Sequence, residues 1–248
     1  MKTKAELKEM AKELEKVYDV HIIGLVVTGS RMTGTNNSGS DADYKAIFIP
    51  TLKSIYLGND KRVIIHNQSK EKNNCNDTDI ELINIKSLIN KLVVNSMQEV
   101  IFVQSLLSPR AYLNTTLDFS ALEYGSGLYD NLWKSWFGFG DRVFRANQKN
   151  PDQPDWKLIA DSLRTFTMMM EIITTGKIIY PLYNAQLIKD IRAEKYSFVA
   201  AMEMVEKARK EAQQSEQKII PVLDNQSRLN LANQLKLDLI CTYHKVQI

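Results

Sequence analysis

The stretch from His21 to Pro50 reads HIIGLVVTGSRMTGTNNSGSDADYKAIFIP. Its two ends, residues 21–28 and 44–49, are short apolar runs rich in β-branched side chains, which is typical of buried strands. Between them lies a segment rich in Gly, Ser, Thr and Asn, a composition that forms turns and exposes backbone N–H groups. We therefore expect two core strands joined by a loop that faces something polar.

A Gly-Ser pair follows the first of these strands directly. Gly29 and Ser30 lead toward a short helix, so unpaired N–H groups and the serine hydroxyl would point at one spot, an arrangement that suits phosphates. Glycine lets a phosphate come close to the backbone. We therefore expect Gly29 and Ser30 to bind the β- and γ-phosphates of a nucleotide.

Two aspartates, Asp41 and Asp43, stand at the start of the second strand. Residues two apart on a strand project on the same face, where two like charges are costly unless cations neutralise them. Carboxylate oxygens favour Mg²⁺, with Mn²⁺ as the alternative ion. The same Ser-Asp-x-Asp pattern also occurs in ordinary turns, where aspartates bond to nearby backbone N–H groups.

A third acidic position favours the metal-binding interpretation. Residues 79–82 (Asp-Ile-Glu-Leu) alternate polar with apolar side chains, as a half-buried strand does, so Asp79 and Glu81 share one face. Either could be a metal ligand or catalytic base in a two-metal site, where one metal activates an attacking hydroxyl and the other steadies the triphosphate. The sequence leaves open which of the two completes the site.

A longer signature contains these motifs: Gly29-Ser30-Arg31, Gly34, Ser40-Asp41-Ala42-Asp43 and Ile47-Phe48-Ile49-Pro50. It resembles the signature of a family of nucleotidyltransferases from bacteria and their phages, the RNA-repair-pathway DNA polymerase β-like family. The likeness continues through residues 79–82, the helix with Asn95 and Glu99, and residues 157–164 and 175–177. The resemblance implies transfer of a nucleoside monophosphate from an NTP, with Mg²⁺ as cofactor, to an acceptor hydroxyl, for which RNA is the expected acceptor.

Two positions depart from that family's pattern. Ala46 stands where the family usually has glycine, and Asp161 stands where histidine is expected. These departures keep open a second interpretation, a non-catalytic nucleotide- or partner-binding module of the antitoxin type on the same fold. An active enzyme could also use a protein side chain or a small molecule such as an aminoglycoside as acceptor, because the metal chemistry is the same.

Three cations are candidate nucleotide contacts: Arg31, Lys157 and Arg164. Guanidinium and ammonium groups can neutralise the charge that develops during phosphoryl transfer. Each of the three fits equally well as a solvated or salt-bridged surface residue. The three histidines and two cysteines, by contrast, show neither metal-ligand spacing nor the grouping of a nucleophile with a base.

The hydrophobic pattern divides the chain into an α/β part and a helical part. Residues 4–18 predict an amphipathic first helix, and one helical stripe runs from about residue 85 to residue 107. The helices expected beyond residue 120 are 127–147, 156–176, 183–193, 196–213 and 227–244. We predict an α+β fold: a polymerase β-like nucleotidyltransferase domain with a mixed sheet (1–120), then a helical domain (121–248) that closes the nucleotide cleft.

Composition sets limits on partners and location. The net charge of the 248 residues is +3, which permits a polyanionic partner without indicating one. The N-terminus lacks the apolar region of a signal peptide, and no run approaches the roughly 18 apolar residues of a membrane helix. We therefore expect a cytoplasmic protein with reduced thiols and no membrane partner.

Overall fold

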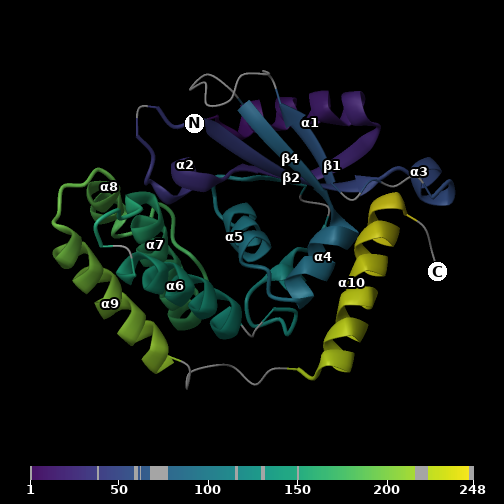
Figure 1. The fold of residues 1–248 in the computed structure, drawn as a ribbon. Coiled ribbons are helices and arrows are strands. Elements are labelled where there is room, and N and C mark those ends of the chain that lie inside the picture. Colours follow the sequence, from purple (N-terminus) through teal and green to yellow (C-terminus); the bar gives the residue numbers. More distant parts are fainter. Residues whose placement is uncertain are drawn as a thin grey trace.

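A five-stranded mixed sheet contains the quoted stretch and forms the centre of the α/β part (Figure 1). Its strands are β1 (Val20–Val27), β2 (Ala42–Pro50), β3 (Val63–Asn67), β4 (Thr78–Asn84) and β5 (Tyr112–Leu113). They lie in the order β3-β4-β2-β1-β5; β2 and β4 are parallel, and the other neighbours are antiparallel. The computed structural model describes residues 2–37, 39–58, 61, 63–67, 78–114, 117–129, 132–149, 151–215 and 223–245.

The register between β2 and β4 decides which side chains share a face. Asp43 lies opposite Asp79, and Lys45 lies opposite Glu81. Because side chains alternate along a strand, these four residues project on the same face of the sheet. The predicted alternation of residues 79–82 is therefore confirmed.

Helix α1 (Lys4–Tyr18) covers the opposite face of the sheet (Figure 1). It begins with a capping box: the backbone N–H of Glu6 donates to Thr3 Oγ1, and the backbone N–H of Thr3 donates to the Glu6 carboxylate. Its apolar stripe buries Leu7, Ala11 and Leu14. The predicted first helix is confirmed at the expected residues.

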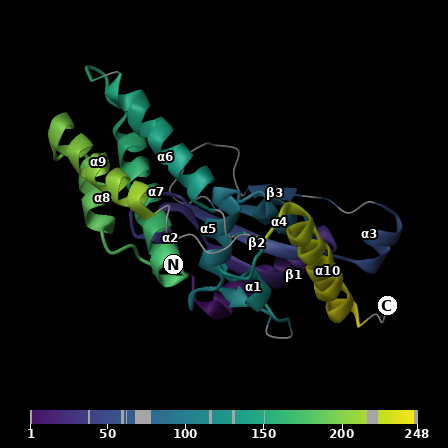
Figure 2. The same ribbon diagram turned by 90° about the horizontal axis from the view of Figure 1, so that it is seen from below.

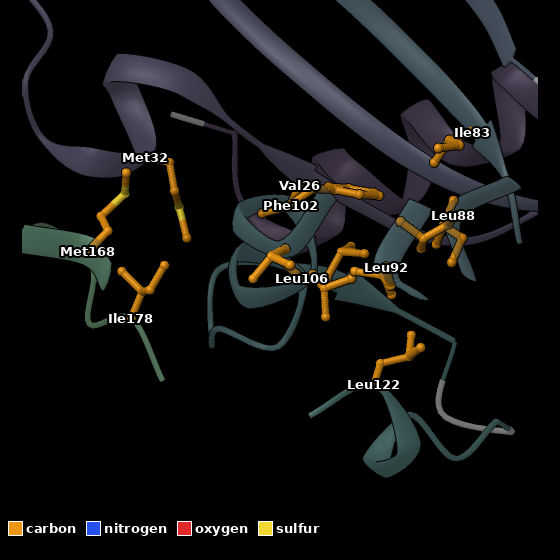
Figure 3. Packing of buried hydrophobic residues seen from close by; sticks show 14 of the residues in the cluster. Val26, Met32, Ile83, Leu88, Leu92, Phe102, Leu106, Leu122, Met168 and Ile178 are labelled. Carbon is orange, nitrogen blue, oxygen red and sulfur yellow. The ribbon is translucent and has the colours of Figure 1, made fainter. Parts of the chain in front are cut away.

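The stripe expected from residue 85 to residue 107 is two helices, α4 (Ile85–Val93) and α5 (Met97–Leu106). The chain breaks at Asn95, which adopts a left-handed backbone conformation (φ 55°). Apolar spacing resumes in phase after the turn, so periodicity alone did not show the break. Both helices lie on the face of the sheet that carries Asp43, where Phe102 packs under Val26 (Figure 3).

Short elements were not predicted from the sequence. These are β3, β5 and helix α3 (Leu52–Tyr56), each of five residues or fewer. Short edge strands carry too few residues to show an alternation. Most of the polar stretch at 66–78, from residue 68 to residue 77, lies outside the described residues.

The second part of the chain is helical, as predicted, and the α+β class is confirmed. After a 3₁₀ turn, η1 (Ser120–Leu122), it contains α6 (Leu132–Gln148), α7 (Trp156–Thr175), α8 (Ala185–Arg192), α9 (Phe198–Gln214) and α10 (Asn225–His244). Helices α6 to α9 pack together beside one end of the sheet (Figures 1 and 2). In the described part of the chain, no helix combines the length and apolarity that crossing a bilayer requires.

Several contacts join the helical part to the sheet part, and two of them involve α7 and α10. Met168 of α7 and Ile178 lie beside Met32 of the short helix α2 (Gly29–Thr33), and all three side chains are buried (Figure 3). The second contact is made by α10, which returns to α4. Where the boundary between domains falls, at residue 120 or elsewhere, stays a prediction.

Arg228 fastens α10 to the α/β part. Its guanidinium is buried and donates to the carbonyl oxygens of Val93 and Leu223, each at 3.1 Å. At the other end of α10, His244 Nε2 lies 3.1 Å from the carbonyl oxygen of Pro50. Both ends of α10 are therefore hydrogen-bonded to the α/β part.

Gly140 lets α6 and α7 approach closely. A Cβ atom at Gly140 would lie 2.7 Å from the ring of Phe166. We expect Gly140→Ala to lower the free energy of unfolding by about 1–3 kcal/mol, the usual cost of overpacking a core, in urea denaturation. Gly138→Ala is the control, because the space around Gly138 is open and alanine should raise stability by up to about 1 kcal/mol. Equal effects of the two substitutions would contradict this packing.

Candidate active site

A cavity of about 510 Å³ lies where the sheet, α2, α5 and α7 meet. The sheet contributes carboxylates and a lysine, α2 contributes its first residue, and α7 contributes an arginine. The polar residues among its walls include Gly29, Asp43, Lys45, Asp79, Glu81, Gln98, Ser105 and Arg164. The cavity therefore combines residues from both parts of the chain.

Asp43 and Asp79 form the acidic centre of this cavity. They are opposite one another in the register of two parallel strands, and Asp41 lies just before the first of these strands. Burial and then the charges of Asp41 and Asp79 raise the pKa of Asp43 above its ordinary value, although Arg31 acts in the opposite direction. The charges of Asp41 and Asp79 therefore both act on Asp43, and the assignment of the three as metal ligands stays a prediction.

The donor chemistry of this acidic centre fits a hard divalent cation. Carboxylate oxygens are the ligands that Mg²⁺ and Mn²⁺ prefer, and a cation would relieve the like-charge repulsion that Asp43 experiences. In the described part of the chain, however, no three acidic, histidine or cysteine side chains already converge as a metal site.

Gly29 allows close contact between α2 and the acidic centre. Its φ is +62°, and an added Cβ atom would lie 2.9 Å from Asp43 Oδ2. Both the conformation and the contact favour glycine here. Ser30, which the sequence paired with Gly29 as a phosphate contact, is half-buried and not among the residues that line the cavity.

Arg31 holds the loop that presents Asp41. Its Nε donates to the carbonyl oxygen of Asp41 (2.7 Å), and its Nη2 donates to the carbonyl oxygen of Ser40 (2.5 Å). These bonds fix the backbone immediately before β2. The structure thus places Arg31 beside the acidic centre and outside the cavity wall.

A buried ion-pair network, which the sequence did not reveal, lies next to the acidic centre. Lys45 Nζ is 3.2 Å from Glu81 and 3.5 Å from Glu99 of α5, and Lys91 Nζ is 2.8 Å from the same Glu99 oxygen. Ser96 donates a short hydrogen bond to Glu99. We call these five residues the Lys45 network.

The pKa of Glu99 is lowered within this network. Burial alone would raise the pKa of Glu99, but hydrogen bonds from Lys91 and Ser96 and the charge of Lys45 outweigh burial and hold its pKa below the ordinary value. Residues 45 and 99 are far apart in sequence and share no motif. A buried lysine in a strand that also carries Asp43 was the one sequence signal that could have indicated a partner.

Arg164 brings a positive charge to the cavity from α7. Its Nη2 is 3.1 Å from Asp161, the residue that stands where histidine was expected. Its Nε is buried and has no hydrogen-bond partner in the described residues. The Arg164 side chain is 27% exposed and lines the cavity, so its positive charge can attract an anionic ligand there.

Lys157, the other predicted cation of α7, is exposed and does not line the cavity. It precedes Arg164 by two helical turns, which is about 10 Å along the axis. A role for Lys157 in nucleotide binding therefore stays a prediction. The Asp43, Asp79, Glu81, Gly29 and Arg164 positions are the predicted residues that meet in the cavity.

Comparison with known proteins identifies related sequences. Residues 2–236 match the RNA repair pathway DNA polymerase beta family. Among curated proteins, none matches this chain. A crystal structure of a nucleotidyltransferase-like protein from Exiguobacterium sibiricum is similar over 85% of this chain and 74% of that chain, with 10% identity and a TM-score of 0.38. That structural likeness is too remote to support an argument about the site.

Proposed function

The chain belongs to the RNA repair pathway DNA polymerase beta family, and from that premise we propose that it transfers a nucleoside monophosphate from an NTP to RNA. It is thus a polymerase β-like nucleotidyltransferase, and the proposal concerns its metal, its acceptor and the residues of its site. The acceptor group in this proposal is a hydroxyl of the RNA.

One observation carries the proposal: an acidic centre lies against Gly29 in a cavity that Arg164 completes from the helical part. Carboxylates alone would fit many cation sites. The guanidinium of Arg164, in the wall of the same cavity, adds a positive charge that suits an anionic ligand. Together these features suit a metal-bound triphosphate better than either feature does alone.

Asp41, Asp43 and Asp79 would hold the cofactor, Mg²⁺ or Mn²⁺. When bound, the metal would supply activation of the acceptor hydroxyl and neutralisation of the triphosphate charge. The acceptor oxygen forms a bond to the α-phosphorus, the bond from that phosphorus to the bridging oxygen breaks, and pyrophosphate leaves. Asp79 would accept the hydroxyl proton.

The phosphates are expected at the side of the cavity formed by α2 and α7. Arg164 lines this side of the cavity, and its guanidinium can donate to phosphate oxygens there. The N–H groups that begin α2 have no acceptor within the helix. Ser30 and Lys157 could contribute only from outside the cavity wall described above.

The test is to incubate the protein with α-labelled ATP, CTP, GTP or UTP, in Mg²⁺ or Mn²⁺, with and without total small RNA. Label in RNA that depends on the metal would support the proposal. Label on the protein itself would replace RNA by a protein acceptor. If neither transfer nor NTP binding occurred, the non-catalytic binding module would be the better interpretation, and NTP with metal would give no thermal stabilisation.

Asp79 and Glu81 are expected to differ strongly as substitutions. Glu81 is neutralised by Lys45, whereas Asp79 lies opposite Asp43 and acts on its charge. We expect Asp79→Asn to lower the rate of transfer by at least about 10²-fold, because it removes a metal ligand. We expect Glu81→Gln to lower the rate by less than about tenfold, because Glu81 lies beside the metal site without binding the metal. Rates measured at saturating NTP and metal would show this, and the reverse order would identify Glu81 as the third ligand.

A further inference from the structure

The Lys45 network is balanced in charge; Lys45 and Glu99 are closed to solvent, whereas the side chain of Lys91 is 43% exposed. Two ammonium groups, of Lys45 and Lys91, face two carboxylates, of Glu81 and Glu99. The side chains of Lys45 and Glu99 are 9% and 2% exposed, whereas that of Glu81 is 36% exposed. The network therefore neutralises itself without any charge from the acidic centre.

Glu81 has the freedom and the proximity to act as a metal ligand. It lies two residues beyond Asp79 on the same face of β4, about 7 Å along the strand. Of the two carboxylates that Lys45 contacts, Glu81 is more exposed than Glu99. What restrains it is the ion pair with Lys45, whose ammonium would otherwise be buried with a single partner.

Glu99 in turn decides where the ammonium of Lys45 lies. Lys45 stands two residues after Asp43 on the same face of β2, so its flexible side chain could also turn toward the aspartates. Glu99 draws it the other way, toward α5, where it lies 5.2 Å from the centre of the Phe102 ring. Lys91 and Ser96 fix Glu99 itself.

We propose that Lys45 and Glu99 are positioning residues: Glu99 holds the ammonium of Lys45 away from the aspartates, and Lys45 holds Glu81 out of the metal site. The inference rests on the function proposed above, in which the aspartates bind the metal. In this proposal Glu99 of α5, which touches neither metal nor substrate, decides that Asp79 and not Glu81 is the third metal ligand.

The test is a titration of the full-length protein with Mn²⁺, read by the electron paramagnetic resonance of the free ion. In Lys45→Met, Glu81 is released and joins the metal site, so we expect Mn²⁺ to bind more tightly by roughly fivefold or more, a typical coupling between neighbours. In Glu99→Gln, the ammonium turns toward the aspartates, so binding should weaken by roughly fivefold. Opposite signs are the signature, because a purely structural role would move both variants the same way.

A second set of variants completes a double-mutant cycle between Lys45 and Glu81. In Lys45→Met/Glu81→Gln, affinity for Mn²⁺ should return to within about twofold of wild type, and Lys45→Arg should resemble wild type. Thermal melts check folding; Lys45→Met keeps Glu99 paired with Lys91, and its Glu81 is partly exposed. If Lys45→Met binds Mn²⁺ no more tightly than wild type, or the gain survives Glu81→Gln, the proposal is wrong.

Two controls separate this inference from the proposed function. If Asp43→Asn leaves Mn²⁺ binding unchanged, the metal site is misplaced and both proposals fail. If the cycle behaves as expected but wild-type protein transfers no nucleotide, the proposed function fails while the positioning role stands. If transfer occurs but the cycle is absent, only the positioning role fails.

Discussion

The Asp43→Asn protein is expected to fold as wild type and to transfer nucleotide at least about 10³-fold more slowly, since a lost metal ligand removes several kcal/mol of transition-state stabilisation. Asparagine keeps the shape of the side chain and removes the charge. It also removes a carboxylate whose pKa is raised by burial and then by repulsion from Asp41 and Asp79, so stability should not fall. The measurement is single-turnover transfer from α-labelled NTP, with a thermal melt on the same preparation.

A matched control for Asp43→Asn is Asp152→Asn, which makes the same chemical change at an exposed position outside the cavity. Its rate should equal that of wild type. A second comparison, Asp41→Asn, tests whether the residue at the start of β2 belongs to the same site. Near-normal transfer by Asp43→Asn would remove the basis for the catalytic assignment.

Arg164→Gln is expected to lower the rate of transfer by about 10²-fold, the usual effect of removing one donor from developing charge. The substitution removes the guanidinium and its positive charge from the cavity wall. Asp161 then loses its partner but remains partly exposed, so the cost in stability should be small. Steady-state kinetics should show whether the loss falls on kcat or on KM for NTP.

Arg145→Gln is the control for Arg164→Gln. Arg145 is also a helical arginine paired with an aspartate, Asp141 at 2.7 Å, but its side chain is 63% exposed and lies outside the cavity. Transfer by this variant should stay within about twofold of wild type, because exposed ion pairs contribute little. Equal losses in the two variants would mean that Arg164 acts through general stability and not through the cavity.

The sequence predicted those parts of the fold whose pattern is local. The first helix, the strands on either side of the Gly-Ser loop and the acidic strand each repeat their side chains with a regular period, which burial on one face requires. The break at Asn95 was not predicted, because a single left-handed residue can interrupt a helix without disturbing the apolar spacing. Edge strands such as β5, two residues long, have no pattern to read.

The candidate site could be predicted from the sequence only where its residues are close together along the chain. Asp41, Asp43 and Gly29 are close in sequence, so spacing placed them together. The preference for Asp79 over Glu81 depends instead on the register of β4 against β2 and on the partner of Glu81. The Lys45 to Glu99 contact joins residues 54 positions apart, a pairing that the sequence could not indicate.

The contact between α10 and α4 affects how the protein is made. Residues 225–244 leave the ribosome after every other described element, yet they cover α4 and give Arg228 to the carbonyl oxygen of Val93. The nascent α/β part therefore emerges with one helix uncovered, and it stays so while more than a hundred further residues are synthesised. A newly made chain would therefore expose the face of α4 that α10 covers until α10 itself has been synthesised.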